Sequence, residues 1–167
     1  ANISNPGTIT YDYRNYDNNP ITEGAVAAVK SALECAGFSV NLNKITRSYY
    51  SKVLNPATQN DMSGAGWGPD WANASTVIPP LFTPNGGFDL SRYDDATFQA
   101  AIATALANGS RTSQARQWQQ LNIDAMSAGL VVPRLFTSTQ SLVGSNVKNA
   151  FLWAPYGSFP YSAIAVQ

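Results

Sequence analysis

The chain of 167 residues contains no histidine and a single cysteine, and these two scarcities exclude whole classes of site. Without histidine, neither a Ser-His-Asp nor a Cys-His arrangement can form, and the side chain that most often transfers protons near neutral pH is missing. Because Cys35 is the only cysteine, no disulfide and no cysteine-based zinc site can form within the chain. We expect no catalytic residues, no metal site and no cofactor.

Charge is also scarce and balanced. Ten Lys and Arg residues offset ten Asp and Glu residues, and only 12% of the chain is charged. No broad basic face can form to bind phosphates, so a nucleic-acid partner or an anionic membrane surface is not predicted. No stretch approaches the roughly 20 apolar residues of a membrane span, and the first six residues lack the basic and apolar regions of a signal peptide. The sequence therefore indicates a cytosolic protein, or else a mature product or fragment.

The first third of the chain contains a strand, a helix and a second strand. Apolar and polar residues alternate over Thr8–Arg14, which predicts a half-buried strand. Asn19 and Pro20 are typical of a helix start, and Gly37 is typical of a helix end. Alternation resumes over residues 38–43. A parallel strand–helix–strand unit follows from this order, so the fold class is α/β. The apolar stripe of the helix consists of Val26, Val29, Leu33 and Ala36.

In the rest of the chain, helices and strands are predicted from the spacing of apolar residues and from the glycine and proline residues that interrupt them. Helices are expected at residues 48–54, 76–82, 95–107 and 112–127. Strands are expected at residues 61–67, 130–136, 140–143 and 163–166, the first of them a central strand. At this length we expect a single α/β domain over residues 1–167.

Two aspartates and the single cysteine are expected to have structural roles. Asp94 and Asp95 immediately precede a predicted helix, where a carboxylate caps free N–H groups and complements the helix dipole. Cys35 lies near the apolar stripe of the first helix, so we expect a small buried side chain.

The densest group of glycine and tryptophan residues is Gly64–Trp71, with the sequence GAGWGPDW. Its glycine spacing differs from the dinucleotide-binding pattern G-x-G-x-x-G. A carboxylate beside two indoles can bind a cationic amine, while the ring faces contact an apolar or sugar group. Asp70, Trp67 and Trp71 therefore form a candidate ligand-binding edge. The alternative is that both indoles anchor the core and Asp70 caps the next turn.

The ordered set of elements resembles the C-terminal lobe of family 5 extracellular solute-binding proteins, the peptide- and nickel-binding group that serves ABC importers. The resemblance covers nearly the whole chain. It is carried by the first strand, by AGFSVNL at residues 36–42, by residues 61–71, by SRYDDATF at residues 91–98, by the helix around residues 116–126 and by VVP at residues 131–133. It implies one lobe of a type II periplasmic-binding-protein-like fold, with a central mixed sheet flanked by helices.

The resemblance also implies roles for the candidate residues. The tryptophan that matches Trp67 lines a side-chain pocket in peptide-binding relatives, and an aspartate three residues later receives the peptide α-amino group, a role that falls here on Asp70. Trp71 and Tyr93 are expected beside them at the cleft. Some oligopeptide binders carry an arginine three residues before that tryptophan, placed for a peptide carboxylate, but this chain has Gly64 there.

The implied function is capture of a peptide or another small polar solute for import, without catalysis. The implied partners are the ligand, the missing N-terminal lobe of the same protein and the membrane subunits of an ABC importer. The implied location is extracellular, periplasmic or attached to the cell envelope. Family members are much longer, so we expect the second lobe to be encoded upstream of Ala1. Two rival functions remain, a carbohydrate-acting hydrolase with paired carboxylates and a structural interaction module with buried indoles.

Overall fold

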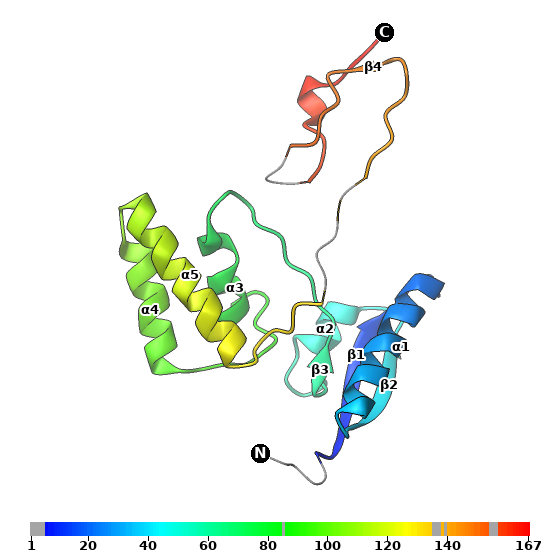
Figure 1. Ribbon diagram of the computed structural model, residues 1–167, viewed down its shortest axis with the longest axis vertical. Coiled ribbons are helices and arrows are strands. Elements are labelled where there is room, and N and C mark those ends of the chain that lie inside the picture. Colours follow the sequence, from blue (N-terminus) through cyan, green and yellow to red (C-terminus); the bar gives the residue numbers. More distant parts are fainter. Residues whose placement is uncertain (1–5, 85, 135–137, 139, 154–156) are drawn as a thin grey trace. The chain divides into compact units, whose positions relative to one another are not determined.

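The computed structural model describes residues 6–84, 86–134, 138, 140–153 and 157–167. The chain divides into two compact units, Ala1–Gly66 and Trp67–Gln167. Figure 1 shows the helices and strands of both units.

The first unit is a parallel sheet with a crossover helix. Strand β1 (Thr8–Arg14) is followed by helix α1 (Pro20–Cys35) and strand β2 (Ser39–Ile45), and Thr8 of β1 pairs with Ser39 in parallel register. A two-residue strand, β3 (Met62–Ser63), pairs in parallel with the other edge of β1. The strand–helix–strand prediction is thus confirmed. The prediction of a central strand at residues 61–67 is wrong, because β1 is central in the order β2-β1-β3 and β3 lies at the edge.

Helix α1 is bounded by the residues that predicted it. The side chain of Asn19 accepts a hydrogen bond from the backbone N–H of Ile21 at 2.9 Å, and Pro20 opens the helix. At the other end Gly37 adopts φ of +98°, and the N–H of Phe38 donates to the carbonyl of Leu33 at 3.2 Å. This pattern of bonds closes a helix around a left-handed residue, which favours glycine.

The core of the first unit lies between α1 and the sheet. Its buried members are Tyr11, Tyr13, Val26 and Val40. Cys35 is exposed, which contradicts the expectation that it is buried. Cys35 follows the buried Val26 by nine positions, which is two and a half helical turns at 100° per residue. Cys35 and Val26 therefore lie on opposite sides of α1. A short helix, α2 (Tyr49–Val53), follows β2 as predicted.

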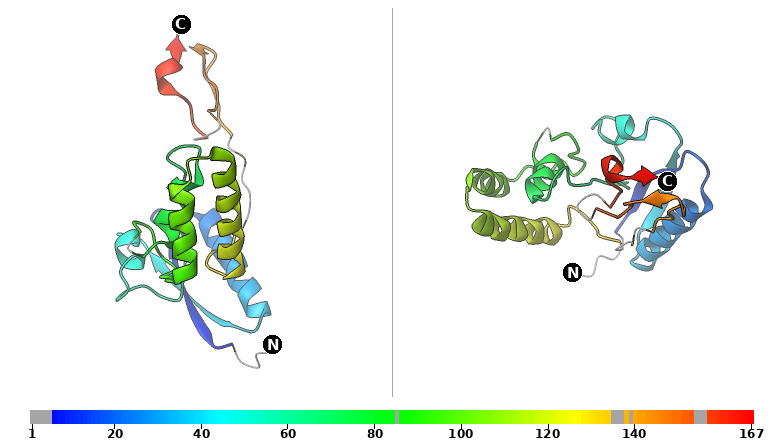
Figure 2. Two further views of the ribbon diagram at one scale, coloured as in Figure 1. Left: turned by 90° about the vertical axis from the view of Figure 1, so that its left-hand side faces the viewer. Right: turned by 90° about the horizontal axis from the view of Figure 1, so that it is seen from above.

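The second unit is built around a helix hairpin. A 3₁₀ turn (Ala74–Thr76) and helix α3 (Ile78–Phe82) precede α4 (Ala96–Ala107) and α5 (Arg111–Ser127), which lie side by side (Figures 1 and 2). These helices were predicted to within a few residues. The buried core consists of Ile78, Phe82, Phe98, Ile102, Ala105, Trp118, Leu121 and Ala125. Leu106 follows the buried Ile102 by four positions, a spacing typical of one helix face, but it is exposed, and Ala105 lies on the buried side of α4.

The start of α4 confirms the capping prediction. Asp95 precedes the helix, and its side chain accepts a hydrogen bond from the N–H of Phe98 at 2.8 Å. This bond satisfies one of the free donors of the first helical turn.

The segment after α5 departs most from prediction. Residues 130–134 do not form a strand, and residues 135 and 136 of the predicted strand lie outside the described residues. Instead, Gly129 at φ of +71° turns the chain, and the N–H of Leu130 donates to the carbonyl of Ala125 at 3.1 Å. Residues 140–143 also form no strand. β4 (Val147–Lys148) pairs in antiparallel fashion with β5 (Ala165–Val166), so the last predicted strand is confirmed only at its end.

Candidate functional site

Trp67 is held by two contacts and remains partly exposed. Its indole Nε1 donates to the backbone carbonyl of Thr76 at 2.7 Å, and its ring centroid lies 4.7 Å from that of Phe88 at an interplanar angle of 48°. The residue nevertheless keeps 38% of its surface exposed. These contacts fix the indole in orientation while leaving part of it available to a ligand.

Asp70 is positioned through the same threonine. Its backbone N–H donates to Oγ1 of Thr76 at 3.3 Å, and Oγ1 in turn donates to the carbonyl of Asn73 at 3.0 Å. Thr76 is buried, whereas Asp70 is exposed. The structure therefore brings Trp67 and Asp70 together at one buried residue, Trp67 at its backbone carbonyl and Asp70 at its hydroxyl. Thr76 could not be predicted from the sequence, because a threonine at the start of a short predicted helix carries no signal for such a role.

The turn after Trp71 is capped by Asn73 rather than by Asp70. The side-chain oxygen of Asn73 accepts from the N–H of Ser75 at 2.9 Å, and its amide nitrogen donates to the side chain of Gln114 at 2.8 Å. Trp71 is 60% exposed. Among the described residues, neither Trp67 nor Trp71 is a member of a buried core cluster. The interpretation of both indoles as core anchors, with Asp70 as the cap, is thus wrong for this structure.

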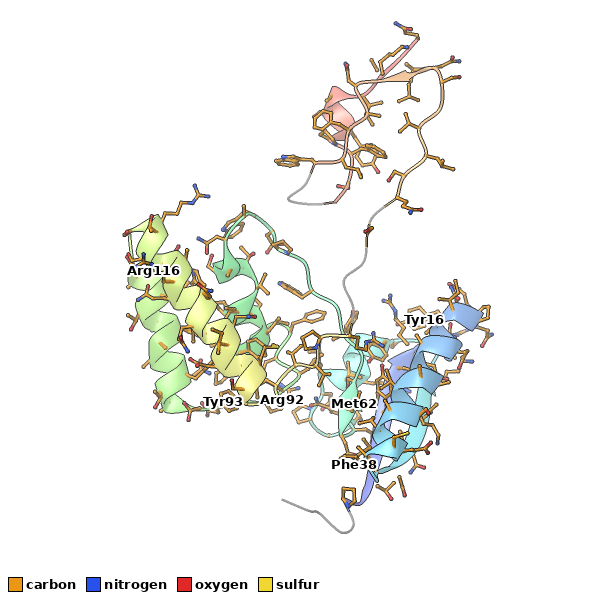
Figure 3. The ribbon with its side chains drawn as sticks, viewed as in Figure 1. Tyr16, Phe38, Met62, Arg92, Tyr93 and Arg116 are labelled. Carbon is orange, nitrogen blue, oxygen red and sulfur yellow. The ribbon has the colours of Figure 1, made fainter. Side chains whose placement is uncertain are left out.

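Tyr93 lies in the loop that leads into α4, beside Arg92, and both are labelled in Figure 3. Its ring packs edge-on against Phe98, with centroids 5.5 Å apart and an interplanar angle of 80°. The side chain is half-buried against the core of the second unit. The packing of Tyr93 on α4 fixes its ring, and a role for it in ligand binding remains a prediction.

In the first unit, Gly64 lies close to the hydroxyl groups of two tyrosines. The hydroxyl of Tyr49 donates to the Gly64 carbonyl at 2.7 Å and to the Asp12 carbonyl at 3.1 Å. A Cβ at position 64 would lie 3.1 Å from the hydroxyl of Tyr11. Burial, with smaller contributions from the neighbouring Tyr11 and Asp12, raises the pKa of Tyr49 far above its ordinary value. Tyr49 therefore remains a hydrogen-bond donor at any physiological pH.

Asp12 is buried, and its side chain accepts three hydrogen bonds from two asparagines. It is 0% exposed, and its oxygens accept from the side chain of Asn43 at 2.7 Å, from the side chain of Asn60 at 2.8 Å and from the N–H of Asn60 at 3.2 Å. A buried polar group requires such hydrogen-bond partners. Alternation in β1 predicted an outward-facing residue here, and nothing in the local pattern indicated the two asparagines. Asp12 links three segments of the first unit rather than contacting solvent.

A second polar cluster links β1, α1 and β2. Glu23 accepts from the hydroxyl of Tyr13 at 2.8 Å and from the side chain of Asn15 at 2.7 Å, and it forms an ion pair with Lys44 at 2.6 Å. The hydrogen bond from Lys44, followed by those from Tyr13 and Asn15, lowers the pKa of Glu23 below its ordinary value. The cluster joins the ends of three elements through the charged form of one residue.

Two cavities open in the second unit. One, of about 240 Å³, is lined by Ala72, Asn73, Ala74, Arg111, Gln114, Ala115 and Trp118. The other, of about 600 Å³, lies between α3 and α4. Neither is lined by Trp67, Asp70, Trp71 or Tyr93.

In the part of the chain that the structure describes, no three Asp, Glu or Cys side chains gather as metal ligands, and no helix has the length and apolarity to cross a membrane.

No protein-family model matches the chain, and no curated protein sequence matches it. Solved structures do match. "Clavulanic acid biosynthesis oligopeptide binding protein 2" is similar with a TM-score of 0.79 and 18% identity, over 95% of this chain and 31% of its own. OppA of Haemophilus influenzae, solved in complex with the peptide RPPGFSPFR, has a TM-score of 0.75 and 19% identity over 98% of this chain and 31% of its own. The substrate-binding domain of an oligopeptide ABC transporter from Bacillus anthracis has a TM-score of 0.70 and 20% identity, over 96% of this chain and 31% of its own.

At these identities the similarity establishes the fold. The chain has an α/β fold with a parallel sheet flanked by a helix, as in periplasmic-binding-protein-like solute-binding proteins, and the predicted fold class is confirmed. The chain spans about a third of the length of these structures, 31% in each case.

Proposed function

We propose that the chain is the C-terminal lobe, one α/β domain over residues 1–167, of an extracellular solute-binding protein that delivers peptides or similar amine-bearing solutes to an ABC importer. The observation that carries this proposal is the similarity of 95% of the chain to an oligopeptide binding protein at a TM-score of 0.79. Two further solved structures of the same kind, one holding a peptide, support the same ligand class. The lobe binds and does not catalyse.

The candidate edge supplies suitable chemistry for such a ligand. The carboxylate of Asp70 pairs with the α-amino group of the ligand, because an ammonium group removed from water requires a charged partner. The exposed part of the Trp67 ring contacts the apolar part of the ligand, and Trp71 and Tyr93 extend this surface. The backbone of Asp70 and the indole of Trp67 are both held by Thr76, which supports the assignment of these two residues to one site.

The proposed site is one half of a clamp. Solute-binding proteins of this fold close two lobes around the ligand by hinge motion, and this chain spans 31% of the length of its structural neighbours. The full protein therefore includes an N-terminal lobe, acts outside the cytoplasmic membrane or in the cell envelope, and docks on the membrane subunits of the importer. The 167-residue chain alone buries less of the ligand and binds it weakly.

Native mass spectrometry of the full-length protein, purified without denaturation, tests this proposal. We expect co-purifying small molecules that carry a primary amine, with short peptides prominent among them. The control is the 167-residue chain, purified in the same way, which should retain little or none. Full-length protein that retains only amine-free molecules, or that takes up no member of an added tripeptide pool, contradicts the proposal.

A further inference from the structure

β3 is too short to be fixed by strand pairing alone. It consists of Met62 and Ser63, which pair with Tyr11 and Asp12 of β1, and Met62 is labelled in Figure 3. Two pairs in a parallel ladder give few hydrogen bonds, and parallel pairing is slightly weaker per residue than antiparallel pairing. Since the segment Gly64–Trp71 leaves the sheet from β3, its point of departure depends on contacts beyond the ladder.

The start of β3 is held by carboxylates. Oδ2 of Asp12 accepts from the backbone N–H of Asn60 at 3.2 Å, and Oδ2 of Asp61 accepts from the N–H of Thr10 at 2.8 Å. These bonds link the residues before β3 to β1 on the side where the chain enters the sheet.

The end of β3 is held by one backbone hydrogen bond and by one buried hydroxyl. The N–H of Gly64 donates to the Asp12 carbonyl at 3.1 Å, and the hydroxyl of Tyr49 donates both to the Gly64 carbonyl at 2.7 Å and to the Asp12 carbonyl at 3.1 Å. Tyr49 is 1% exposed, so water does not replace its hydroxyl in this position. A buried tyrosine needs only one acceptor to satisfy its proton. Here the proton is shared between two backbone carbonyls, one on β1 and one on the residue after β3.

We propose that Tyr49 is a positioning residue for the segment that leads to the ligand-binding edge: its hydroxyl fixes the carbonyl of Gly64 and hence the point at which the chain leaves the sheet. Its effect on ligand affinity rests on the proposed function, whereas its effect on Gly64 does not. The hydroxyl of Tyr11 restricts the same point sterically, because it lies where a side chain at position 64 would begin.

Amide hydrogen exchange on the 167-residue chain, followed by NMR, tests the proposal directly. The substitution Tyr49→Phe removes the hydroxyl and keeps the ring. We expect exchange of the Gly64 amide to accelerate about tenfold, the effect of losing one hydrogen bond of ordinary strength. The Ser39 amide, which donates to the Gly7 carbonyl at 2.9 Å at the far end of β2, should keep its rate.

The matched control is Tyr13→Phe. Tyr13 is also a buried tyrosine of β1, and its hydroxyl donates to Glu23 of α1 at 2.8 Å rather than to the Gly64 carbonyl. This variant should leave the Gly64 amide unchanged. Unchanged exchange at Gly64 in Tyr49→Phe, or equal acceleration at Gly64 and Ser39, overturns the positioning role.

A second measurement uses the full-length protein and a tripeptide pool as the probe. Tyr49→Phe should weaken binding of the pool about tenfold, and Tyr13→Phe should not change it. If the wild type fails to bind the pool, the proposed function fails, and the exchange rates at Gly64 still decide the role of Tyr49. If the wild type binds and both variants bind equally well, the link from Tyr49 to the ligand edge is refuted.

Discussion

The indole nitrogen of Trp67 donates a hydrogen bond to the backbone carbonyl of Thr76 at 2.7 Å. The hydroxyl of the same threonine accepts a hydrogen bond from the backbone N–H of Asp70 at 3.3 Å. One buried residue thus links the backbone of an exposed carboxylate to the ring of a partly exposed indole. Thr76 organises the candidate edge without belonging to its surface, since its own side chain is buried.

Replacing Thr76 with valine should destabilise the chain. Valine keeps the shape of threonine but removes both hydrogen bonds of the Thr76 hydroxyl, the one from the N–H of Asp70 and the one to the Asn73 carbonyl. We expect a loss of about 1–2 kcal/mol in the free energy of unfolding, measured by urea denaturation with tryptophan fluorescence.

The same substitution at Thr83 is a matched control with the opposite expectation. Oγ1 of Thr83 is buried and has no hydrogen-bond partner in the described part of the chain. Because an unsatisfied buried hydroxyl is costly, Thr83→Val should be neutral or slightly stabilising. Equal destabilisation by the two valine substitutions would show that loss of threonine itself, and not the bonds of Thr76, is responsible.

Adding a methyl group at Gly64 should strain the end of β3. The new Cβ would lie 3.1 Å from the hydroxyl of Tyr11, so Gly64→Ala should cost about 1–3 kcal/mol. The cost should fall when Tyr11→Phe is combined with it, and Gly66→Ala, where nothing lies within 4 Å, serves as the control. Additive effects of the Gly64 and Tyr11 substitutions in a double-mutant cycle would rule out the steric contact.

The hydrogen bonds and ion pair of Glu23 should make the free energy of unfolding depend on pH. Because the folded-state pKa of Glu23 is lowered, its contribution is fully present above the ordinary pKa of a glutamate and is lost as the pH falls through the folded value. Urea midpoints of wild type and Glu23→Gln should therefore converge on acidification. Glu34→Gln, which removes an exposed pair with Lys30, should leave the pH profile close to that of wild type. A constant gap between wild type and Glu23→Gln across the acid range is incompatible with this interpretation.

The parts of the fold that the sequence predicted are those with strong local signals. Asn19, Pro20 and Gly37 bound α1 because capping and backbone conformation are properties of the residues themselves. The apolar run after α5 was mispredicted because apolarity alone does not supply a partner strand, and residues 131–134 remain exposed.

For the candidate site, the sequence indicated which residues carry the chemistry but not what holds them. Trp67 and Asp70 stood out by composition and spacing, whereas Thr76 and Tyr49 act through backbone groups that come together only in the folded chain. Asp12 was missed for the same reason, since its partners Asn43 and Asn60 are distant in sequence.

The central claim is that the carboxylate of Asp70 receives an amino group of the ligand. Isothermal titration calorimetry on the full-length protein, with a tripeptide pool and the same pool acetylated at its N-termini, measures this directly. Wild type should prefer the free amine, Asp70→Asn should lose that preference, and Asp94→Asn, which removes an exposed carboxylate before α4, should retain it. An unchanged preference for the free amine in Asp70→Asn would contradict the account.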